Sequence, residues 1–359
     1  MTELLADHTT LRVGGPARRW VEATTTAELV AAVAEADAAG EPVLVLSGGS
    51  NVVVADSGFD GVVVHVATKG ITDDGGSYCE IDADAVGDIE DAASCGGMLV
   101  EVQAGENWDD FVAWTIDQGY IGIEALSGIP GAVGSTPIQN VGAYGQEVAQ
   151  TIWSVRTWDR QTRQYRTFAN ADCQFSYRNS RFKAEPGRYL VVSVMFQFLQ
   201  GSLGAPIRYA ELARRLGVEL GERAPMVDVR EIVLALRRGK GMVLDPADHD
   251  TWSAGSFFTN PVLPAADAAL LPEDAPRFDA GEGLVKSSAA WLIERAGFAK
   301  GFGTPPATLS TKHTLALTNR GGATASDIVA LAREVRDGVR ERFGVGLVPE
   351  PVLVGVALD

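Results

Sequence analysis

Two glycine-rich stretches contain residue types that could bind a phosphorylated ligand. The first is the loop SGGSN at residues 47–51, which follows the apolar run Val43–Leu46. Small residues in a tight turn can point several backbone N–H groups in one direction, and such a nest suits the charge of a pyrophosphate. A plain connection between strands would give the same sequence. The loop also lacks the Gly-x-x-x-x-Gly-Lys-Ser/Thr spacing of a P-loop, so both interpretations stay open.

The second stretch covers residues 122–148 and has little periodicity and few charges. It spaces Gly128, Gly131 and Gly134 three residues apart and continues with the side-chain amides of Gln139 and Asn140. The Gly-x-Gly-x-x-Gly fingerprint is missing, which argues against a Rossmann dinucleotide site. A loop of this length without regular structure is usually functional, and its amides could bind a flat polar ligand. An Ω-loop packed on itself is the alternative.

Regular elements must position these stretches. Thr25 and Glu28 form a capping-box pattern and Gly40 is a typical stop, so we predict a helix over residues 27–39. Apolar runs predict strands at 43–46, 52–54 and 62–64, the first of them fully buried. This β-α-β-turn-β opening is an α/β signature.

The rest of the chain mixes strands and helices. Further strands are predicted at 100–104, 152–158, 164–168, 189–199 and 351–357, of which 152–158, 164–168 and 189–199 should be antiparallel. Helices are predicted at 108–118, 226–238, 287–296 and 326–343. Composition changes at Gln200–Gly204, which predicts a domain boundary near residue 200. The expected fold class is α+β.

Composition excludes several classes of partner. The chain has 359 residues, 46% of them hydrophobic, so it can bury a sizeable core in two or three domains. Its 30 Lys and Arg against 47 Asp and Glu leave a net charge of −17, which argues against nucleic acid and anionic membrane surfaces. No signal peptide is evident, and no apolar run reaches the roughly 18 residues of a membrane span. We therefore expect a cytoplasmic protein.

The cysteines and histidines indicate neither a disulfide framework nor a metal site. Cys79, Cys95 and Cys173 are odd in number and contain no Cys-x-x-Cys pair. The four histidines are scattered and form no His-Glu-x-x-His motif. We expect no bound metal.

Taken together, ordered motifs from residue 10 to residue 350 resemble one family closely, the UDP-N-acetylenolpyruvoylglucosamine reductases (UDP-N-acetylmuramate dehydrogenases) of bacterial peptidoglycan synthesis. The motifs are TLRVGG at 10–15, GGSN at 48–51, GIPGAVGSTPIQNVGAYG at 128–145, YRNSRFK at 177–183, AGSFFTNP at 254–261, AAWLIE at 289–294, AG at 296–297 and PE at 349–350.

The resemblance implies a noncovalent FAD in a two-subdomain fold of the vanillyl-alcohol-oxidase (PCMH) type. The FAD-binding region would cover residues 1–200, with subdomains at about 1–68 and 69–200, and residues 351–359 would return to the first. Residues 201–350 would form an α+β domain for the UDP-sugar. The implied FAD-binding residues are Ser47, Gly48, Gly49, Ser50, Asn51, Gly128, Ile129, Pro130, Gly131, Gly134, Ser135, Gln139, Asn140, Gly142, Ala143 and Tyr144.

The resemblance also implies that electrons pass from NADPH through FAD to the enolpyruvyl double bond. Arg178, Ser256 and Glu350 match the family's catalytic residues. A guanidinium offers two parallel donors to a carboxylate, an acid beside that carboxylate could be protonated, and a hydroxyl could protonate a carbanion. Tyr209, Lys240 and Asn260 match residues that bind the nucleotide-sugar, and Tyr209 resembles the mobile tyrosine loop of one family subtype.

Two other functions remain as alternatives. One is a flavoprotein oxidase of the same fold with FAD attached covalently through His or Cys, for which His65 is the histidine nearest a flavin loop in sequence. The other is a non-catalytic module that binds flavin or a nucleotide-sugar. In every case we expect small-molecule partners, neither nucleic acid nor membrane, and a monomer.

Overall fold

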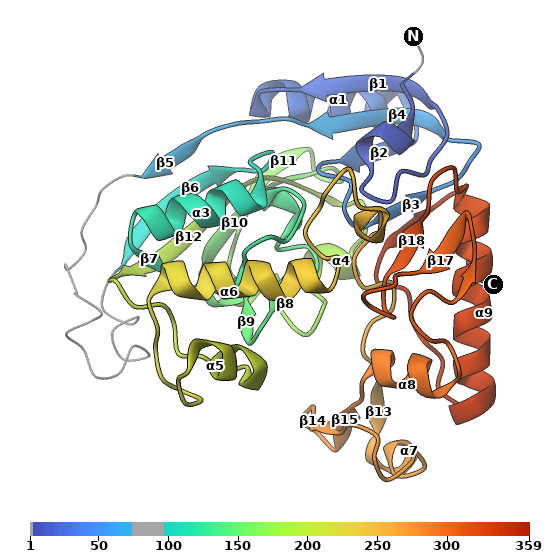
Figure 1. Cartoon of the computed structure of the whole chain (residues 1–359). Coiled ribbons are helices and arrows are strands. Elements are labelled where there is room, and N and C mark those ends of the chain that lie inside the picture. Colours follow the sequence, from blue (N-terminus) through green and yellow to red (C-terminus); the bar gives the residue numbers. More distant parts are fainter. Residues whose placement is uncertain (1–2, 74–96) are drawn as a thin grey trace. The chain divides into compact units, whose positions relative to one another are not determined.

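The structure, a computed structural model, describes residues 3–73 and 97–359 (Figure 1). Cys79 and Cys95, for which the sequence predicts neither a disulfide nor a metal site, lie outside the described residues. Backbone contacts divide the chain into two compact units that the chain visits in turn. Unit 1 consists of Met1–Arg18, Gly49–Asp60 and Gly239–Asp359, and unit 2 consists of Arg19–Gly48 and Gly61–Arg238.

Unit 2 therefore continues beyond the expected boundary near residue 200. The reason is a small apolar core in which helices α5 (Ala210–Leu216) and α6 (Met226–Gly239) pack with Ala125. Leu212, Val229 and Val233 in these helices are fully buried. The compositional change at Gln200–Gly204 marks the end of a strand and not the end of the unit.

Helix α1 (Thr26–Ala39) confirms the predicted helix and its cap. The Thr25 hydroxyl accepts the Glu28 N–H, the Glu28 carboxylate accepts the Thr25 N–H, and Gly40 ends the helix at φ 69°. The helix lies beside a three-stranded sheet of order β1-β4-β2, whose strands are β1 (Ala17–Ala23), β4 (Phe59–Val66) and β2 (Val43–Leu46).

Strand β2 was predicted to be fully buried, and this is wrong. Val45 is 36% exposed. Among the described residues β2 is an edge strand that pairs with β4, in parallel, and with no second strand.

The main sheet of unit 2 is antiparallel and confirms the predicted strands. It has six strands in the order β11-β10-β12-β6-β5, with β7 also pairing with β12. The strands are β5 (Ile71–Asp73), β6 (Met98–Gln103), β7 (Tyr120–Ile121), β10 (Ile152–Asp159), β11 (Gln164–Ala169) and β12 (Tyr189–Gln200).

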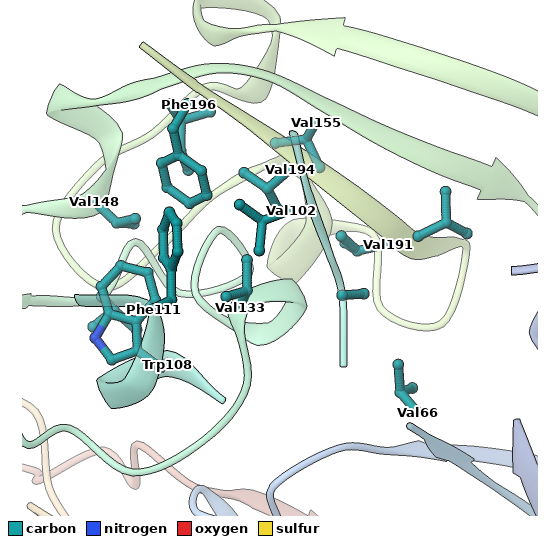
Figure 2. Close-up of a cluster of buried hydrophobic side chains, with 14 of the residues drawn as sticks. Val66, Val102, Trp108, Phe111, Val133, Val148, Val155, Val191, Val194 and Phe196 are labelled. Atoms are coloured by element: carbon teal, nitrogen blue, oxygen red, sulfur yellow. The ribbon is translucent and has the colours of Figure 1, made fainter. Parts of the chain in front are cut away.

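Helix α3 (Trp108–Asp117) packs its aromatic face on this sheet. Figure 2 shows Phe111 between Trp108 and Phe196, with ring centroids 6.0 Å and 5.0 Å from that of Phe111. The buried Trp108 indole donates to the Leu126 carbonyl at 3.1 Å, so the same aromatic core holds the start of the second glycine-rich stretch.

Short elements divide the second glycine-rich stretch, where no periodicity was seen. They are η2 (Glu124–Leu126), η3 (Val133–Ser135), β8 (Gly142–Ala143), β9 (Gln146–Glu147) and η4 (Val148–Gln150). Two more short helices complete the described part of unit 2, η5 (Asn170–Cys173) and α4 (Arg181–Ala184).

The last strand of unit 1 lies beside a strand from the first 60 residues of the chain. Strand β19 (Val352–Val354) pairs in parallel with β3 (Val52–Val54). It is shorter than the predicted 351–357. Helix α9 (Ala325–Phe343) lies along β17 (Ala307–Leu309) and β18 (Leu317–Asn319) (Figure 1). Strand β17 is the middle strand of this sheet and pairs with β18 on one side and with β16 (Gly303–Thr304) on the other.

The remaining elements of unit 1 are short. A second sheet has the order β13-β15-β14, with β13 (Val262–Pro264), β14 (Phe278–Asp279) and β15 (Leu284–Lys286). The helices are η1 (Leu5–His8), η6 (His249–Thr251), α7 (Ala265–Ala268) and α8 (Ala289–Arg295). Helix α8 confirms the helix predicted at 287–296, and it begins after Ser288, whose hydroxyl caps it.

Candidate active site

The first two residues of the first glycine-rich stretch, Ser47 and Gly48, belong to unit 2, where Gly48 contacts the second stretch. A Cβ added to Gly48 would lie 2.7 Å from the Gly131 Cα atom, a separation that real Cβ atoms essentially never show. The Gly131 carbonyl accepts the backbone N–H of Trp108 at 3.1 Å, and this bond fixes the position of Gly131. Two loops far apart in sequence, each predicted to bind the same ligand, are therefore in contact through Gly48 and Gly131.

The first loop contains backbone donors with no acceptor. The N–H groups of Gly48, Gly49 and Ser50 donate to no group among the described residues. Gly49 has φ 57°, and an added Cβ would lie 1.8 Å from the His8 carbonyl oxygen, so only glycine fits here. Three successive unsatisfied amides in a tight turn are the donor set that phosphate oxygens require.

Arg178 lies against the second stretch. Its Nη2 atom donates to the Gly142 carbonyl at 2.7 Å and its Nη1 to the Asn140 carbonyl at 3.4 Å. A Cβ at Gly142 would come within 3.2 Å of Nη1, so the glycine leaves room for the guanidinium. Lys183 of α4 donates to the Arg178 carbonyl at 3.0 Å and fixes the backbone behind it.

The backbone around this arginine is in an unfavourable conformation. Asn140, Tyr144 and Arg178 have φ values of 46°, 51° and 52°, in the left-handed region that favours glycine. The Asn140 side chain holds this arrangement by donating to Glu147 at 2.7 Å and to the Ser176 carbonyl at 3.2 Å. Residues held in such conformations tend to cluster at functional sites, because the surrounding contacts must be kept for a reason other than stability.

Tyr144 and Tyr209 are in contact. Their rings meet edge to face with centroids 5.3 Å apart. Burial raises the pKa of Tyr144 to about 12, so its hydroxyl stays protonated, and the positive charge of Arg237 on α6 opposes part of that rise. Burial in turn lowers the pKa of Arg237 to about 10. Tyr209 is 38% exposed, which leaves its ring accessible beside the second stretch.

Ser256 and Glu350 come together in unit 1. Gly255, at φ 73°, turns the chain into Ser256. The next residue, Phe257, is buried; its N–H donates to the Leu315 carbonyl at 2.7 Å and its carbonyl accepts the Glu350 N–H at 2.8 Å. The Asn51 side chain donates to the Glu350 carbonyl at 3.4 Å, so Glu350 is also tied to the end of the first loop. Arg178 belongs to unit 2.

Lys240 lies among positive groups of unit 1. Burial, and then the charges of Lys240 and Lys300, lower the pKa of His313 to about 4. His313 is therefore neutral at neutral pH, and the charge of this cluster resides on the two lysines. Such a cluster suits an anion. Asn260, the other predicted substrate residue of unit 1, accepts the Ala289 N–H at 3.0 Å and so holds the start of α8.

The other predicted cofactor residues lie along the second stretch, all in unit 2. Gly128 and Gly134 are buried, whereas Ile129, Pro130, Ser135, Gln139 and Ala143 are partly exposed. A Cβ at Gly134 would lie 2.5 Å from that of Ala104, so this glycine serves packing on β6. The Ser135 hydroxyl donates to the Ala132 carbonyl at 2.7 Å.

Sequence reasoning missed Glu124, the fully buried carboxylate of the second stretch. It accepts the N–H groups of Gly122 at 2.7 Å and Ala205 at 2.6 Å and the Gln146 amide at 2.8 Å. It thereby holds the stretch to the segment before Tyr209. The signal was present, because an acid inside the apolar run GIEALSGIPG must be paired if it is buried.

Two general features of the described residues bear on function. They contain no cluster of three or more His, Cys, Asp and Glu side chains suited to a metal ion. None of their helices combines the length and the apolar character that crossing a membrane demands.

Two parts of the chain match models of known protein families. Residues 245–354 match the family model described as the C-terminal domain of UDP-N-acetylenolpyruvoylglucosamine reductase, and residues 17–167 match that of an FAD binding domain. The α+β fold class with an FAD-binding domain is thus confirmed.

Curated relatives match nearly the whole chain. The UDP-N-acetylenolpyruvoylglucosamine reductase of Cutibacterium acnes is 58% identical over 357 residues, covering 99% of this chain and 90% of its own. That of Streptomyces coelicolor is 55% identical over 365 residues, with the same coverage. The crystal structure of the Thermus caldophilus enzyme matches with a TM-score of 0.62 at 24% identity, over 99% of this chain and 98% of that one, and shows the common fold. The resemblance seen in the motifs is confirmed, and the chain belongs to the UDP-N-acetylenolpyruvoylglucosamine reductase family.

Proposed function

We propose that the protein reduces the enolpyruvyl group of UDP-N-acetylglucosamine enolpyruvate to the lactyl ether of UDP-N-acetylmuramate, with NADPH as reductant, in peptidoglycan synthesis. The observation that supports this best is the 58% identity to a curated reductase of that name over 99% of the chain. The backbone amides of Gly48, Gly49 and Ser50 would suit the cofactor diphosphate, and the Glu350 N–H is bonded to the Phe257 carbonyl, directly after Ser256.

FAD is the cofactor that the family implies, and the residues fit it. The N–H groups of Gly48, Gly49 and Ser50 have no acceptor in the described part of the chain and would bind the diphosphate. The second stretch, with Gln139, Asn140, Gly142 and Tyr144, would hold the ring. When bound, FAD would supply the hydride chemistry that links oxidation of NADPH to reduction of the enolpyruvyl double bond.

The chain's own residues would stabilise what hydride arrival creates. Negative charge develops next to the substrate carboxylate, and fixed donors lower the barrier because they need no reorganisation. Arg178, oriented by two carbonyls, would pair with the carboxylate, and Glu350 in its protonated form would donate a hydrogen bond to it. Ser256 would give its hydroxyl proton to the carbon that becomes the lactyl α-carbon.

The nucleotide-sugar would be bound by Tyr209, Lys240 and Asn260. The positive surroundings of Lys240 suit a phosphate, and the partly exposed ring of Tyr209 suits a residue that moves onto its ligand. We assign the chain to the subtype with the mobile tyrosine loop on this basis. We further propose that it works as a monomer in the cytoplasm, which sedimentation and cell fractionation would test.

The decisive test is NADPH oxidation by the purified protein with and without the enolpyruvyl UDP-sugar. We expect substrate-dependent oxidation with UDP-N-acetylmuramate as product. A protein that binds flavin and UDP-sugar but oxidises no NADPH would be a binding module. Oxidation that depends on oxygen and not on the UDP-sugar would identify an oxidase of the same fold.

A further inference from the structure

The N-terminal segment of unit 1 connects the first glycine-rich loop to the turn that holds Ser256. Thr10 is buried, with 7% of its surface exposed. Its backbone N–H donates to the Gly49 carbonyl at 3.1 Å. Its hydroxyl donates to the Ser253 carbonyl at 2.7 Å, a contact between residues 243 positions apart. One residue thus bonds with its backbone to the loop and with its side chain to the turn.

From Ser253 the connection continues to Ser256. The Ser253 hydroxyl accepts the Gly255 N–H at 3.2 Å, and this bond closes the turn. Gly255 has φ 73°, and Ser256 follows it directly in the chain. The position of the turn, and hence of the Ser256 hydroxyl, depends on the position of the Ser253 carbonyl.

The segment that bears Thr10 is itself rigid. Arg12 lies over the Trp252 ring, with its guanidinium carbon 4.1 Å from the centroid. Asn319 of β18 donates to the carbonyls of Leu11 at 3.2 Å and Arg12 at 3.1 Å. The segment that bears Thr10 is thus hydrogen-bonded to β18, and the Thr10 hydroxyl links this segment to the turn.

We infer that Thr10 is a positioning residue for the proton donor, setting Ser256 relative to the loop that binds the cofactor diphosphate. This inference rests on the role proposed for Ser256. It assigns to the side chain of Thr10 a part in the second half of the reaction, in which substrate is reduced. The backbone bond to Gly49 is independent of the side chain, so side-chain substitution should leave the cofactor loop in place.

The test replaces Thr10 by Val, which keeps the shape and removes the donor, and by Ser, which keeps the donor. Rapid mixing would follow reduction by NADPH and reoxidation by the enolpyruvyl UDP-sugar separately. In Thr10→Val we expect reoxidation to slow by about 10- to 100-fold, the cost of a misplaced catalytic group. Reduction by NADPH and FAD affinity should stay within about twofold, and Thr10→Ser should restore most of the reoxidation rate.

Thr9 provides a matched control. It is equally buried, at 6%, but its hydroxyl donates to the nearby Val13 carbonyl at 3.0 Å and does not reach the turn. Thr9→Val should lower stability as much as Thr10→Val while leaving both half-reactions unchanged. Equal slowing of reoxidation in the two variants would overturn the inference, since a general loss of packing would then explain it. If Thr10→Val does not fold, Thr10→Ala removes the same donor without a new methyl contact.

A double-mutant cycle separates this inference from the proposed function. If Thr10 acts through Ser256, Thr10→Val should have little further effect on reoxidation in the Ser256→Ala background. Additive effects would refute the positioning role while leaving the function intact. A Ser256→Ala enzyme with wild-type reoxidation would instead refute the role of Ser256. Hydrogen exchange of the FAD-free protein gives an independent readout: the Gly255 amide should exchange faster in Thr10→Val than in Thr9→Val.

Discussion

At the scale of single residues, the geometry around Arg178 makes its replacement by lysine a non-conservative change. The guanidinium donates to two carbonyls, at 2.7 Å and 3.4 Å, from a backbone held at φ 52°. An ammonium cannot make both bonds and still offer paired donors to a carboxylate, because it is a point charge without a planar fork. The orientation and the charge stabilisation should therefore be lost together.

We expect Arg178→Lys to slow reoxidation by substrate by about 100-fold or more, in the range reported for loss of a fixed donor to developing negative charge. Reduction by NADPH should be nearly unchanged. Stopped-flow absorbance of the two half-reactions would show this. Equal slowing of both would mean that Arg178 organises the cofactor stretch and does not act on the substrate.

His313 gives a second prediction at this scale, on stability. In the folded protein its pKa is lowered to about 4 by burial and by Lys240 and Lys300, whereas an unfolded histidine titrates near 6.5. Between these values the unfolded state binds more protons, so stability falls as pH decreases from about 6.5 to about 4. The difference corresponds to a loss of about 3 kcal/mol.

Urea unfolding at pH 7 and pH 5 would measure about 2 kcal/mol of this loss, since the rest develops between pH 5 and pH 4. His313→Gln should lose less stability than the wild type over the same interval, because the proton-binding group is gone. Lys300→Gln, which removes one of the two charges, should have an intermediate effect. An unchanged pH dependence in His313→Gln would assign the acid sensitivity to the carboxylates of this unit.

At the scale of elements, the first loop depends on the absence of a side chain at Gly49. Gly49→Ala should place a Cβ 1.8 Å from the His8 carbonyl oxygen, at φ 57°. Either η1 or the loop must move, so we expect FAD affinity to drop by at least about tenfold and stability to drop by more than the 1–2 kcal/mol of left-handed strain alone. Flavin fluorescence titration and thermal unfolding would measure the two effects.

Gly40→Ala is the control that introduces backbone strain without a steric clash. Gly40 has φ 69°, close to that of Gly49, but an added Cβ would meet nothing within 4 Å. It should lose only the strain energy and keep FAD affinity. If both variants lost flavin equally, the effect would be general instability and not the geometry of the loop.

The sequence predicts a structural feature well when the residues that form it are close together along the chain. Helix α1 is predicted to within a residue because its cap is local, with Thr25 and Glu28 three positions apart. Strand β2 is placed correctly but its burial is not, since its edge position depends on partners elsewhere in the chain. The contacts of Gly48 with Gly131 and of Thr10 with Ser253 could not be predicted, because each closes a long loop.

The site shows the same division. Sequence motifs identified Arg178, Ser256 and Glu350 as candidate catalytic residues, but only the fold shows which groups orient them. Glu124 was detectable as a lone acid in an apolar run, whereas Thr10 is an ordinary threonine in sequence. The histidine whose backbone carbonyl lies against Gly49 is His8. His65, the one that the sequence suggests, stacks on Trp20.

At the scale of the whole molecule, the last prediction concerns how the protein holds its flavin. We expect a yellow protein with one noncovalent FAD per chain. His8, the histidine at the loop, has its ring nitrogen 2.6 Å from Glu3, and burial raises the pKa of Cys173 to about 12, so its thiol is a poor nucleophile. Neither side chain is placed or activated for a bond to flavin.

Denaturation in acid or guanidinium should therefore release all the colour into the supernatant, and the released compound should be intact FAD. A ligand that binds only the folded state stabilises it by mass action, by about 2.7 kcal/mol at one hundred times its dissociation constant. The unfolding midpoint should rise with added FAD in the wild type and much less in Gly49→Ala, whose donor loop is displaced. Colour that stays with the denatured chain would show a covalent link and favour the oxidase alternative. Release with an equal FAD-dependent rise of the midpoint in the wild type and in Gly49→Ala would place the flavin outside the loop at residues 47–51.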